Sequence, residues 1–338
     1  ALELLGPDCW ENDYALTLEI AVASLETEYL STHFDVVEAR APQLLARCQS
    51  SLDSVRVHEI RIRAWIGRGD QHKALSIGLE VLDLLGISRL EAPPSAPSDI
   101  AELVELPVMS DPDKRVAMDI MAGIITSAWA VDPVCFRQLT FTMVDLSMGY
   151  GNCPASAFGY AWYGSLLCEA LGDIESGYAF GQLAIALLDR LDARVLRAKV
   201  LNIYATCIGS WQGHVKDCLP FHLDGLQSGL ETGDLEFASY DAAEYVQYLF
   251  LMGQPLEKVR SESQQKLALI KHLKQTFHVD YLSPWLQGTL NLLGEDSVEQ
   301  GTVERKTVEQ KTVSEEAGEQ EAVKQQYLFQ QSVPEEKH

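Results

Sequence analysis

Positive charge is scarce in this sequence. Its 338 residues include 26 Lys and Arg against 49 Asp and Glu, which gives a formal net charge of −23. Such an excess of negative charge repels phosphates and argues against nucleic acid as a partner. No run approaches 18 uninterrupted apolar residues, and the first residues lack the basic and apolar regions of a secretory signal. We therefore expect a cytoplasmic protein that neither spans nor binds a membrane.

The cysteines lack the spacing of paired or metal-binding thiols. There are seven, an odd number, and no C-x-x-C occurs. Most lie inside apolar helical runs, which predicts buried, reduced thiols rather than a disulfide framework.

Motifs for nucleotide chemistry are also missing. There is no G-x-x-x-x-G-K-[ST] loop to bind phosphates, and no H-R-D, D-F-G or glycine-rich nucleotide loop. The run from His58 to Arg61 resembles the phosphoacceptor box of histidine kinases. That box continues with Thr/Asn-Pro, whereas Ile62-Arg63 follows here, which favours an ordinary helix. We predict no catalytic residue and no cofactor in this chain.

One spacing is typical of metal ligands on a helix. His214, Cys218 and His222 stand at i, i+4 and i+8. Pro220, however, lacks the N–H that a helix interior needs, so the helix is expected to begin near Cys218 and leave His214 in a turn. We therefore predict no metal ligands here.

What the sequence does contain is helical periodicity. Runs of 15 to 20 residues, such as 157–171 and 176–191, place apolar residues at i, i+3, i+4 and i+7. No alternating segment bounded by turns indicates a strand. The chain is therefore predicted to be all-α.

An internal repeat of about 41 residues organises these helices. Turns within helix pairs are expected at 131–133, 172–173, 213–214 and 253–254, and their glycines are Gly172, Gly213 and Gly253. Tyr163, Tyr204 and Tyr245 recur at intervals of 41, as do Leu167, Ile208 and Leu249, and Phe180 and Phe221 match once. The repeated side chains predict either one packing layer built again in each unit or the lining of a concave peptide groove.

A turn signature of Gly-Asp followed by a small residue occurs three times. It comprises Gly69-Asp70 with Ala74, Gly172-Asp173 with Gly177, and Gly233-Asp234 with Ala238. The first two resemble the loop of tetratricopeptide helix pairs, where Gly permits the turn, Asp caps the second helix and the small residue allows close approach. The period exceeds the roughly 34 residues of tetratricopeptides and falls in the HEAT and armadillo range. We predict a superhelical array, or α-solenoid, of antiparallel tetratricopeptide-like helix pairs.

Composition divides the chain into four parts. Residues 1–87 are expected to form N-terminal helical repeats, 88–112 a Pro-rich acidic connection with a short helix over 98–106, and 113–294 further tetratricopeptide-like repeats. In 295–338, Thr-Val recurs every five residues and large apolar residues are few. This composition predicts a disordered low-complexity tail or insertion.

Longer segments resemble one protein family. They include ALELLGPDCWENDYALTLEI, ELPVMSDPDKRVAM and DYLSPWLQGTLNLLGE, and the resemblance extends over about residues 1–294. The family comprises large bacterial, especially cyanobacterial, signalling kinases. They join a serine/threonine kinase domain, a STAND-type AAA ATPase, a tetratricopeptide-like region, a GAF domain and a histidine kinase. The resemblance places this chain in the helical region after the ATPase.

The resemblance implies a non-catalytic regulatory or scaffold segment of an ATP-binding signalling kinase. Such a segment would couple the ATPase and kinase modules or dock a protein partner. One alternative is a peptide- or ligand-sensing repeat domain, in which a bound effector shifts the superhelix. Another is an independent helical enzyme, against which the missing motifs argue.

Overall fold

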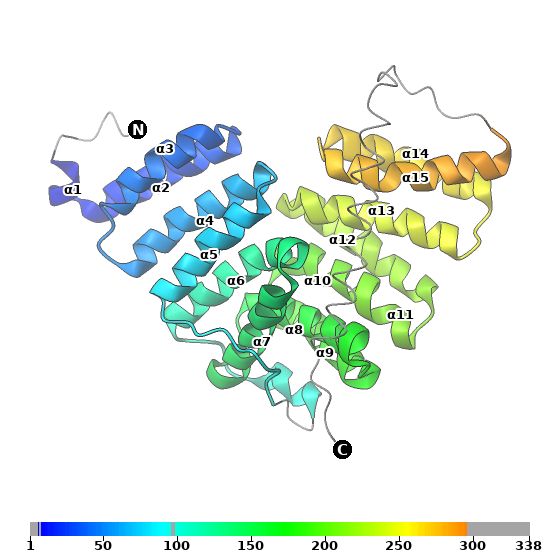
Figure 1. Cartoon of the computed structure of the whole chain (residues 1–338), viewed down its shortest axis with the longest axis horizontal. Helices are drawn as coiled ribbons and strands as arrows, with labels where there is room; N and C mark the ends of the chain where they lie inside the picture. The colour runs from blue at the N-terminus through cyan, green and yellow to red at the C-terminus, as the bar shows by residue number, and fades with distance from the viewer. Residues whose placement is uncertain (1–5, 7, 96–98, 296–338) are drawn as a thin grey trace. The chain divides into compact units, whose positions relative to one another are not determined.

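The structure is a computed structural model that describes residues 6, 8–95 and 99–295. Throughout these residues the chain is helical and forms no strand, as Figure 1 shows. Extended pairing is limited to an isolated parallel bridge between Val108 and Asn152. The prediction of an all-α chain is therefore confirmed. The predicted low-complexity tail lies outside the described residues, apart from Glu295.

The chain divides into two compact units. Unit 1 takes in the residues up to 159 except 99–104, and unit 2 takes in 99–104 and the residues from 160 onwards. The division falls inside the helix α8 (Pro154–Leu166).

Unit 1 is built from helices that pack on their neighbours in sequence. Its helices before α8 are α1 (Cys9–Asn12), α2 (Tyr14–Leu30), α3 (Phe34–Leu45), α4 (Ser51–Gly67), α5 (Gln71–Leu84), α6 (Pro112–Val131) and α7 (Pro133–Tyr150). Contacts run from α2 to α3 and so on to α7, and α4 also touches both α2 and α6. The fully buried side chains of Leu25, Val37 and Val57 bring α2, α3 and α4 into one apolar core.

Unit 2 repeats this consecutive packing. After α8 come the π-helix η3 (Leu167–Leu171), α9 (Ile174–Arg190), the 3₁₀ turn η4 (Arg194–Leu196), α10 (Arg197–Ile203), the π-helix η5 (Tyr204–Ile208), α11 (Gly209–Gln212), the 3₁₀ turn η6 (Val215–Cys218), α12 (Leu219–Thr232), α13 (Leu235–Leu251), α14 (Leu256–His272) and α15 (Thr276–Leu293). Successive helices from α12 to α15 touch, and α13 also touches both α10 and α15.

The predicted turns all fall where one helix ends and the next begins. Gly69, Gly172 and Gly253 have φ of +80°, +70° and +66°, the left-handed region that favours glycine. Asp70 and Asp173 then cap the helices that follow, since their carboxylates accept hydrogen bonds from the N–H groups of residues 73 and 176.

Gly213 ends its helix differently. Its φ is −102° in extended backbone, a conformation open to any residue. Its N–H still donates to the Gly209 carbonyl and closes the last turn of α11. The chain therefore leaves this helix without a left-handed residue.

The Pro-rich connection contains a 3₁₀ helix, η2 (Ile100–Glu105), where the sequence predicts a short helix. The following residues lie against the turn between α7 and α8, where Met109 N–H donates to Asn152 O and Asn152 N–H to Pro107 O. Gly151, at φ +95°, allows this approach, because a Cβ there would lie 2.3 Å from the Pro107 carbonyl oxygen.

Across the described part of the chain, no helix is both long and apolar enough to cross a membrane.

Candidate functional site

The repeated tyrosines occupy two kinds of position. Tyr163 and Tyr204 are 3% and 4% exposed, and their aliphatic companions Leu167 and Ile208 are buried. Tyr245 is only partly buried, although Leu249 beside it is 1% exposed. Two of the three tyrosines thus lie in the interior.

The aromatic contact of these tyrosines repeats with the sequence. The ring of Tyr163 meets Phe180 edge-on with centroids 4.9 Å apart, and Tyr204 meets Phe221 in the same way at 4.9 Å. Both partners advance by 41 residues, so one packing layer is built twice. The next position in this series is Glu262, which cannot supply an aromatic ring, and the ring of Tyr245 instead lies under Lys266.

Close packing around α9 depends on its glycines. A Cβ on Gly177 would lie 2.5 Å from the Cys168 sulfur, and one on Gly181 would lie 2.9 Å from both Ile208 and Tyr204. The two glycines therefore let α9 approach the preceding and the following helix.

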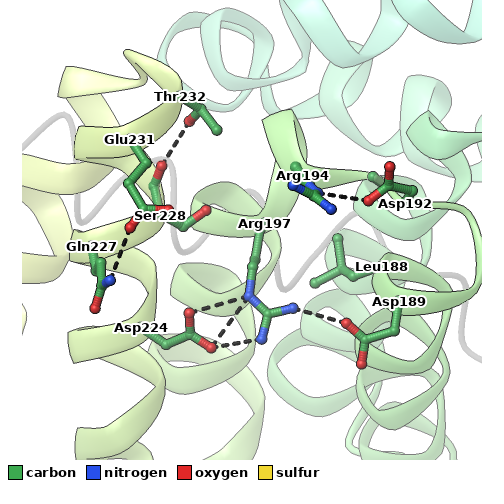
Figure 2. Close-up of a pocket in the computed structure, with 11 residues that line it drawn as sticks. Leu188, Asp189, Asp192, Arg194, Arg197, Asp224, Gln227, Ser228, Glu231 and Thr232 are labelled. Carbon is green, nitrogen blue, oxygen red and sulfur yellow. Dashed lines mark hydrogen bonds and ion pairs between the residues drawn. The ribbon is translucent and has the colours of Figure 1, made fainter.

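A polar hollow of about 460 Å³ opens in unit 2, and Figure 2 shows its lining. The end of α9, the turn after it, α10 and α12 form its walls. Its charged residues are Asp189, Asp192, Arg194, Arg197, Asp224 and Glu231. Four carboxylates thus face two guanidinium groups, which leaves an excess of negative charge.

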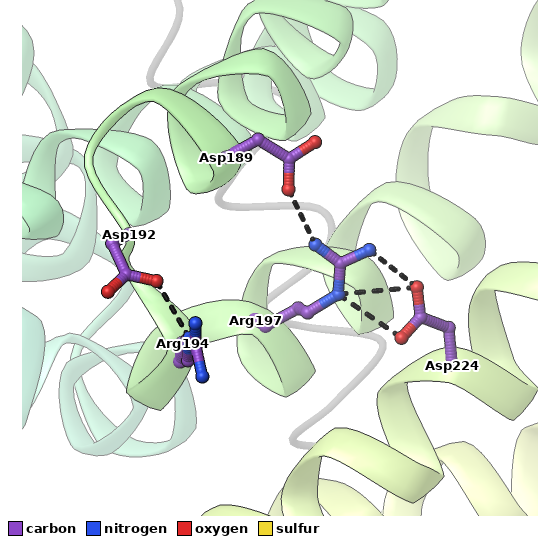
Figure 3. Close-up of polar contacts among 5 residues, drawn as sticks. All are labelled: Asp189, Asp192, Arg194, Arg197 and Asp224. Carbon is purple, nitrogen blue, oxygen red and sulfur yellow. Dashed lines mark hydrogen bonds and ion pairs between the residues drawn. The ribbon is translucent and has the colours of Figure 1, made fainter.

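Ion pairs order the hollow, as Figure 3 shows. Arg197 donates from Nη2 to Asp224 at 2.6 Å and from Nη1 to Asp189 at 3.0 Å, and these carboxylates raise the pKa of the guanidinium. Arg194 donates from Nε to Asp192 at 2.7 Å. With both arginines engaged, the hollow is suited to a cationic group rather than an anionic one.

A second polar cluster is buried inside unit 2. His222 on α12 and Asp241 on α13 are both 0% exposed, and Glu244, one turn further along α13, is 5% exposed. His222 Nδ1 lies 2.9 Å from Asp241 Oδ1 and 3.9 Å from Glu244 Oε2. Among the described residues, this is the group whose donor atoms could hold a metal ion.

Side chains from the neighbouring helix complete the cluster. The amide of Asn202 donates to Asp241 Oδ1 at 3.0 Å and to Glu244 Oε2 at 2.7 Å. Thr206 Oγ1 donates to the same Glu244 oxygen at 2.6 Å. The carboxylates are thereby held in fixed positions.

Burial controls the protonation of the cluster. It lowers the pKa of His222 to about 4 and raises that of Glu244 to about 7. Burial also raises the pKa of Asp241 well above its ordinary range, and the distant Asp234 and Asp224 add to this effect. The site therefore disfavours two simultaneous negative charges unless a cation joins them.

The π-helix η5 lies directly beside this cluster and carries Thr206. A π turn leaves backbone carbonyls without their usual α-helical donor. The Tyr248 hydroxyl compensates by donating to the carbonyl of Ala205 at 3.1 Å and that of Thr206 at 3.3 Å. Tyr248 also packs its ring edge-on against His222, with centroids 5.1 Å apart.

The residues considered from sequence as metal ligands are separated. His214 lies in the predicted turn, where its Nδ1 accepts a hydrogen bond from the N–H of residue 216. Cys218 is buried against Ala205 and Tyr248. Only His222 reaches the polar cluster, and its partners Asp241 and Glu244 were missed by the sequence analysis. Their signal is a carboxylate pair at i, i+3 within an otherwise alanine- and aromatic-rich helix.

The remaining sequence candidates are His58 and the cysteines. His58 is 8% exposed within α4, and burial lowers its pKa. The seven cysteines are free, four of them buried and three partly buried.

In comparisons with known proteins, no protein-family model matches this chain, and no curated protein sequence is significantly similar to it.

Proposed function

We propose that this chain is a non-catalytic helical-repeat segment that docks a protein partner within a multidomain, ATP-binding signalling kinase. The observation that carries the repeat part of the proposal is the aromatic layer that Tyr163 forms with Phe180 and Tyr204 forms again with Phe221. The resemblance of residues 1–294 to the helical region of such kinases supplies the signalling context. A cytoplasmic location belongs to the same proposal.

The finer architecture is also proposed: a superhelical array of tetratricopeptide-like helix pairs. Contacts join α2 with α4 and α4 with α6 in unit 1, and α10 with α13 and α13 with α15 in unit 2. Such contacts are expected when the first helices of successive pairs stack on one another. Stacking gives each pair the apolar neighbour that it lacks alone.

The partner surface is proposed to be the acidic hollow between α9, α10 and α12. Its carboxylates outnumber its guanidinium groups by four to two. A partner segment that presents Lys or Arg would be complementary to it. This hollow also favours the second candidate function, a repeat domain that senses a basic peptide.

Direct binding between this chain and the kinase and ATPase modules that the proposal places beside it tests the docking proposal. The matched variants are Glu231→Lys at the hollow and Glu257→Lys on α14, both exposed. We expect binding by the native chain and by Glu257→Lys, and at least about tenfold weaker binding by Glu231→Lys. Equal binding by all three would reject the hollow as the surface, and no binding by any would reject docking of these modules.

The same variants distinguish docking of these modules from the sensing of a basic peptide. A basic peptide that binds the native chain and not Glu231→Lys, while the neighbouring modules bind neither, would support a peptide sensor instead.

A further inference from the structure

We propose that His222, Asp241 and Glu244 form a site for a first-row divalent metal ion such as Zn²⁺. The three side chains offer one imidazole nitrogen and two carboxylate oxygens that all lie within 4.8 Å of one another. They project from α12 and α13, two helices of unit 2 that pack on each other.

The spacing of the donor atoms suits a small ion. Ligand bonds to zinc of about 2.0–2.2 Å place the ligands of a tetrahedral site about 3.3 Å apart. The observed distances from His222 Nδ1, 2.9 Å to Asp241 and 3.9 Å to Glu244, lie on either side of that value. Shifts of the donor atoms by at most about an ångström would therefore bring both distances to that value.

The charge of the cluster calls for a cation. Two carboxylates are buried here, and buried charges in proteins are paired or coordinate metals. Asp234 and Asp224, on or beside the same two helices, further disfavour a negative charge on Asp241. A divalent ion would neutralise both carboxylates while His222 remained neutral.

An unpartnered buried atom provides a second observation. Oδ2 of Asp241 has no hydrogen-bond partner although the side chain is 0% exposed. Such atoms cost free energy in a folded protein and commonly indicate a missing ligand, water or ion.

The neighbouring side chains would act as the outer shell. Asn202 and Thr206 already hold the carboxylates by hydrogen bonds of 2.6–3.0 Å. Outer-shell donors of this kind orient metal ligands and adjust their affinity.

Metal binding at this site exchanges protons for the ion. The proton shared between His222 Nδ1 and Asp241, and any proton on Glu244, would leave for solvent as the metal–nitrogen and metal–oxygen bonds form. Zinc affinity should therefore fall as the pH is lowered. The imidazole donor favours Zn²⁺ or Co²⁺ over the oxygen-seeking Mg²⁺.

The test uses the full chain with Zn²⁺, and with Co²⁺ as a spectroscopic probe. Equilibrium dialysis with metal analysis gives the stoichiometry and affinity, and thermal melts report stabilisation. The variants are Glu244→Gln and His222→Gln, with exposed His272→Gln as the matched control. Glu244→Gln keeps an acceptor for Thr206, so it should remain folded, which circular dichroism checks.

We expect one Zn²⁺ per chain, a melting temperature that rises with Zn²⁺, and unchanged behaviour in His272→Gln. Both site variants should bind at least about 100-fold more weakly, beyond the loss typical of an outer-shell change. Bound Co²⁺ should show d–d absorption without a thiolate charge-transfer band. Equal Zn²⁺ affinity in native chain and Glu244→Gln, a thiolate band, or no binding at all would each overturn the proposal.

Discussion

At the scale of single residues, Tyr204 is one of the two buried members of the tyrosine series. It packs edge-on against Phe221, and its hydroxyl accepts a hydrogen bond from Gln182 at 2.6 Å. Tyr204→Ala removes these contacts from a side chain that is 4% exposed. We expect it to lower the free energy of unfolding by about 3 kcal/mol.

Tyr245→Ala is the matched comparison for this change. Its ring is partly exposed, and Glu262 stands where the repeat would place its aromatic partner. We therefore expect the free energy of unfolding to fall by only about 1 kcal/mol. Urea unfolding of both variants measures the difference. Equal losses of unfolding free energy at the two positions would contradict the conclusion that Tyr204 is buried in a packing layer and Tyr245 is not.

His278 on α15 makes stability depend on pH. It is 3% exposed, neither ring nitrogen has a hydrogen-bond partner, and its ring lies edge-on to Tyr240 with centroids 4.3 Å apart. Burial lowers its pKa to about 4, against an ordinary value near 6.5. Between these values the unfolded chain binds the proton and the folded chain does not.

Stability from this histidine is therefore present above pH 6.5 and is lost as the pH falls towards 4. At pH 5 the loss should be about 2 kcal/mol. Comparing His278→Leu with the native chain at pH 7.5 and 5 isolates this contribution. The native chain should lose about 2 kcal/mol more than the variant over that interval. Parallel losses would show that His278 is protonated in the folded state.

At the scale of elements, glycines decide how closely helices approach. A methyl group on Gly177 of α9 would lie 2.5 Å from the Cys168 sulfur and 2.7 Å from the Gly164 carbonyl oxygen. Gly177→Ala should therefore push two helices apart and cost about 2 kcal/mol. Gly288 on α15 has no neighbour within 4 Å of the same position, so Gly288→Ala should stabilise by about 0.5 kcal/mol.

Thermal melts of the two alanine variants test this prediction, since the melting temperature should fall in Gly177→Ala and rise in Gly288→Ala. A shift in the same direction for both would refute the close-packing role of Gly177.

The elements were largely predictable from the sequence, for a local reason. Helix periodicity, Gly-Asp turns and capping aspartates act over a few residues, so Gly172 and Asp173 mark a turn whatever surrounds them. The same rules anticipated that Pro220 would stand in the first turn of α12 and His214 before it.

The interior polar site was not predictable in this way. His222 and Asp241 are 19 residues apart on different helices, and their meeting depends on how α12 packs against α13. The π turns η3 and η5 were missed as well, because each shifts the apolar pattern once, by one residue, and steps of three or four residues between apolar positions are ordinary in any helix.

At the scale of the whole chain, each of the two units contains apolar clusters made of its own residues. Leu25, Val37 and Ile60 belong to a core cluster of unit 1, and Tyr204 and Ile208 to one of unit 2. Local unfolding follows such cooperative groups. We expect Tyr204→Ala to reduce hydrogen-exchange protection in α9–α13 and to leave α2–α5 unchanged.

Ile60→Ala, at a residue 1% exposed in unit 1, should give the reverse pattern. Exchange measured by mass spectrometry on both variants distinguishes the units. Equal loss of protection throughout the described helices would mean that they unfold as one cooperative block.

The π turns determine whether one helix pair could replace another in the chain. Tyr163 stands four residues before η3, Tyr204 is the first residue of η5, and Tyr245 lies in the uninterrupted helix α13. One extra residue in a turn rotates everything after it by about 100° around the helix axis. A chimera that copied one pair into the place of another would match its neighbours before that point and present the wrong face beyond it. Each pair is therefore fitted to its own place in the chain, and duplication or consensus design would have to re-create the π turn together with the surfaces that receive it.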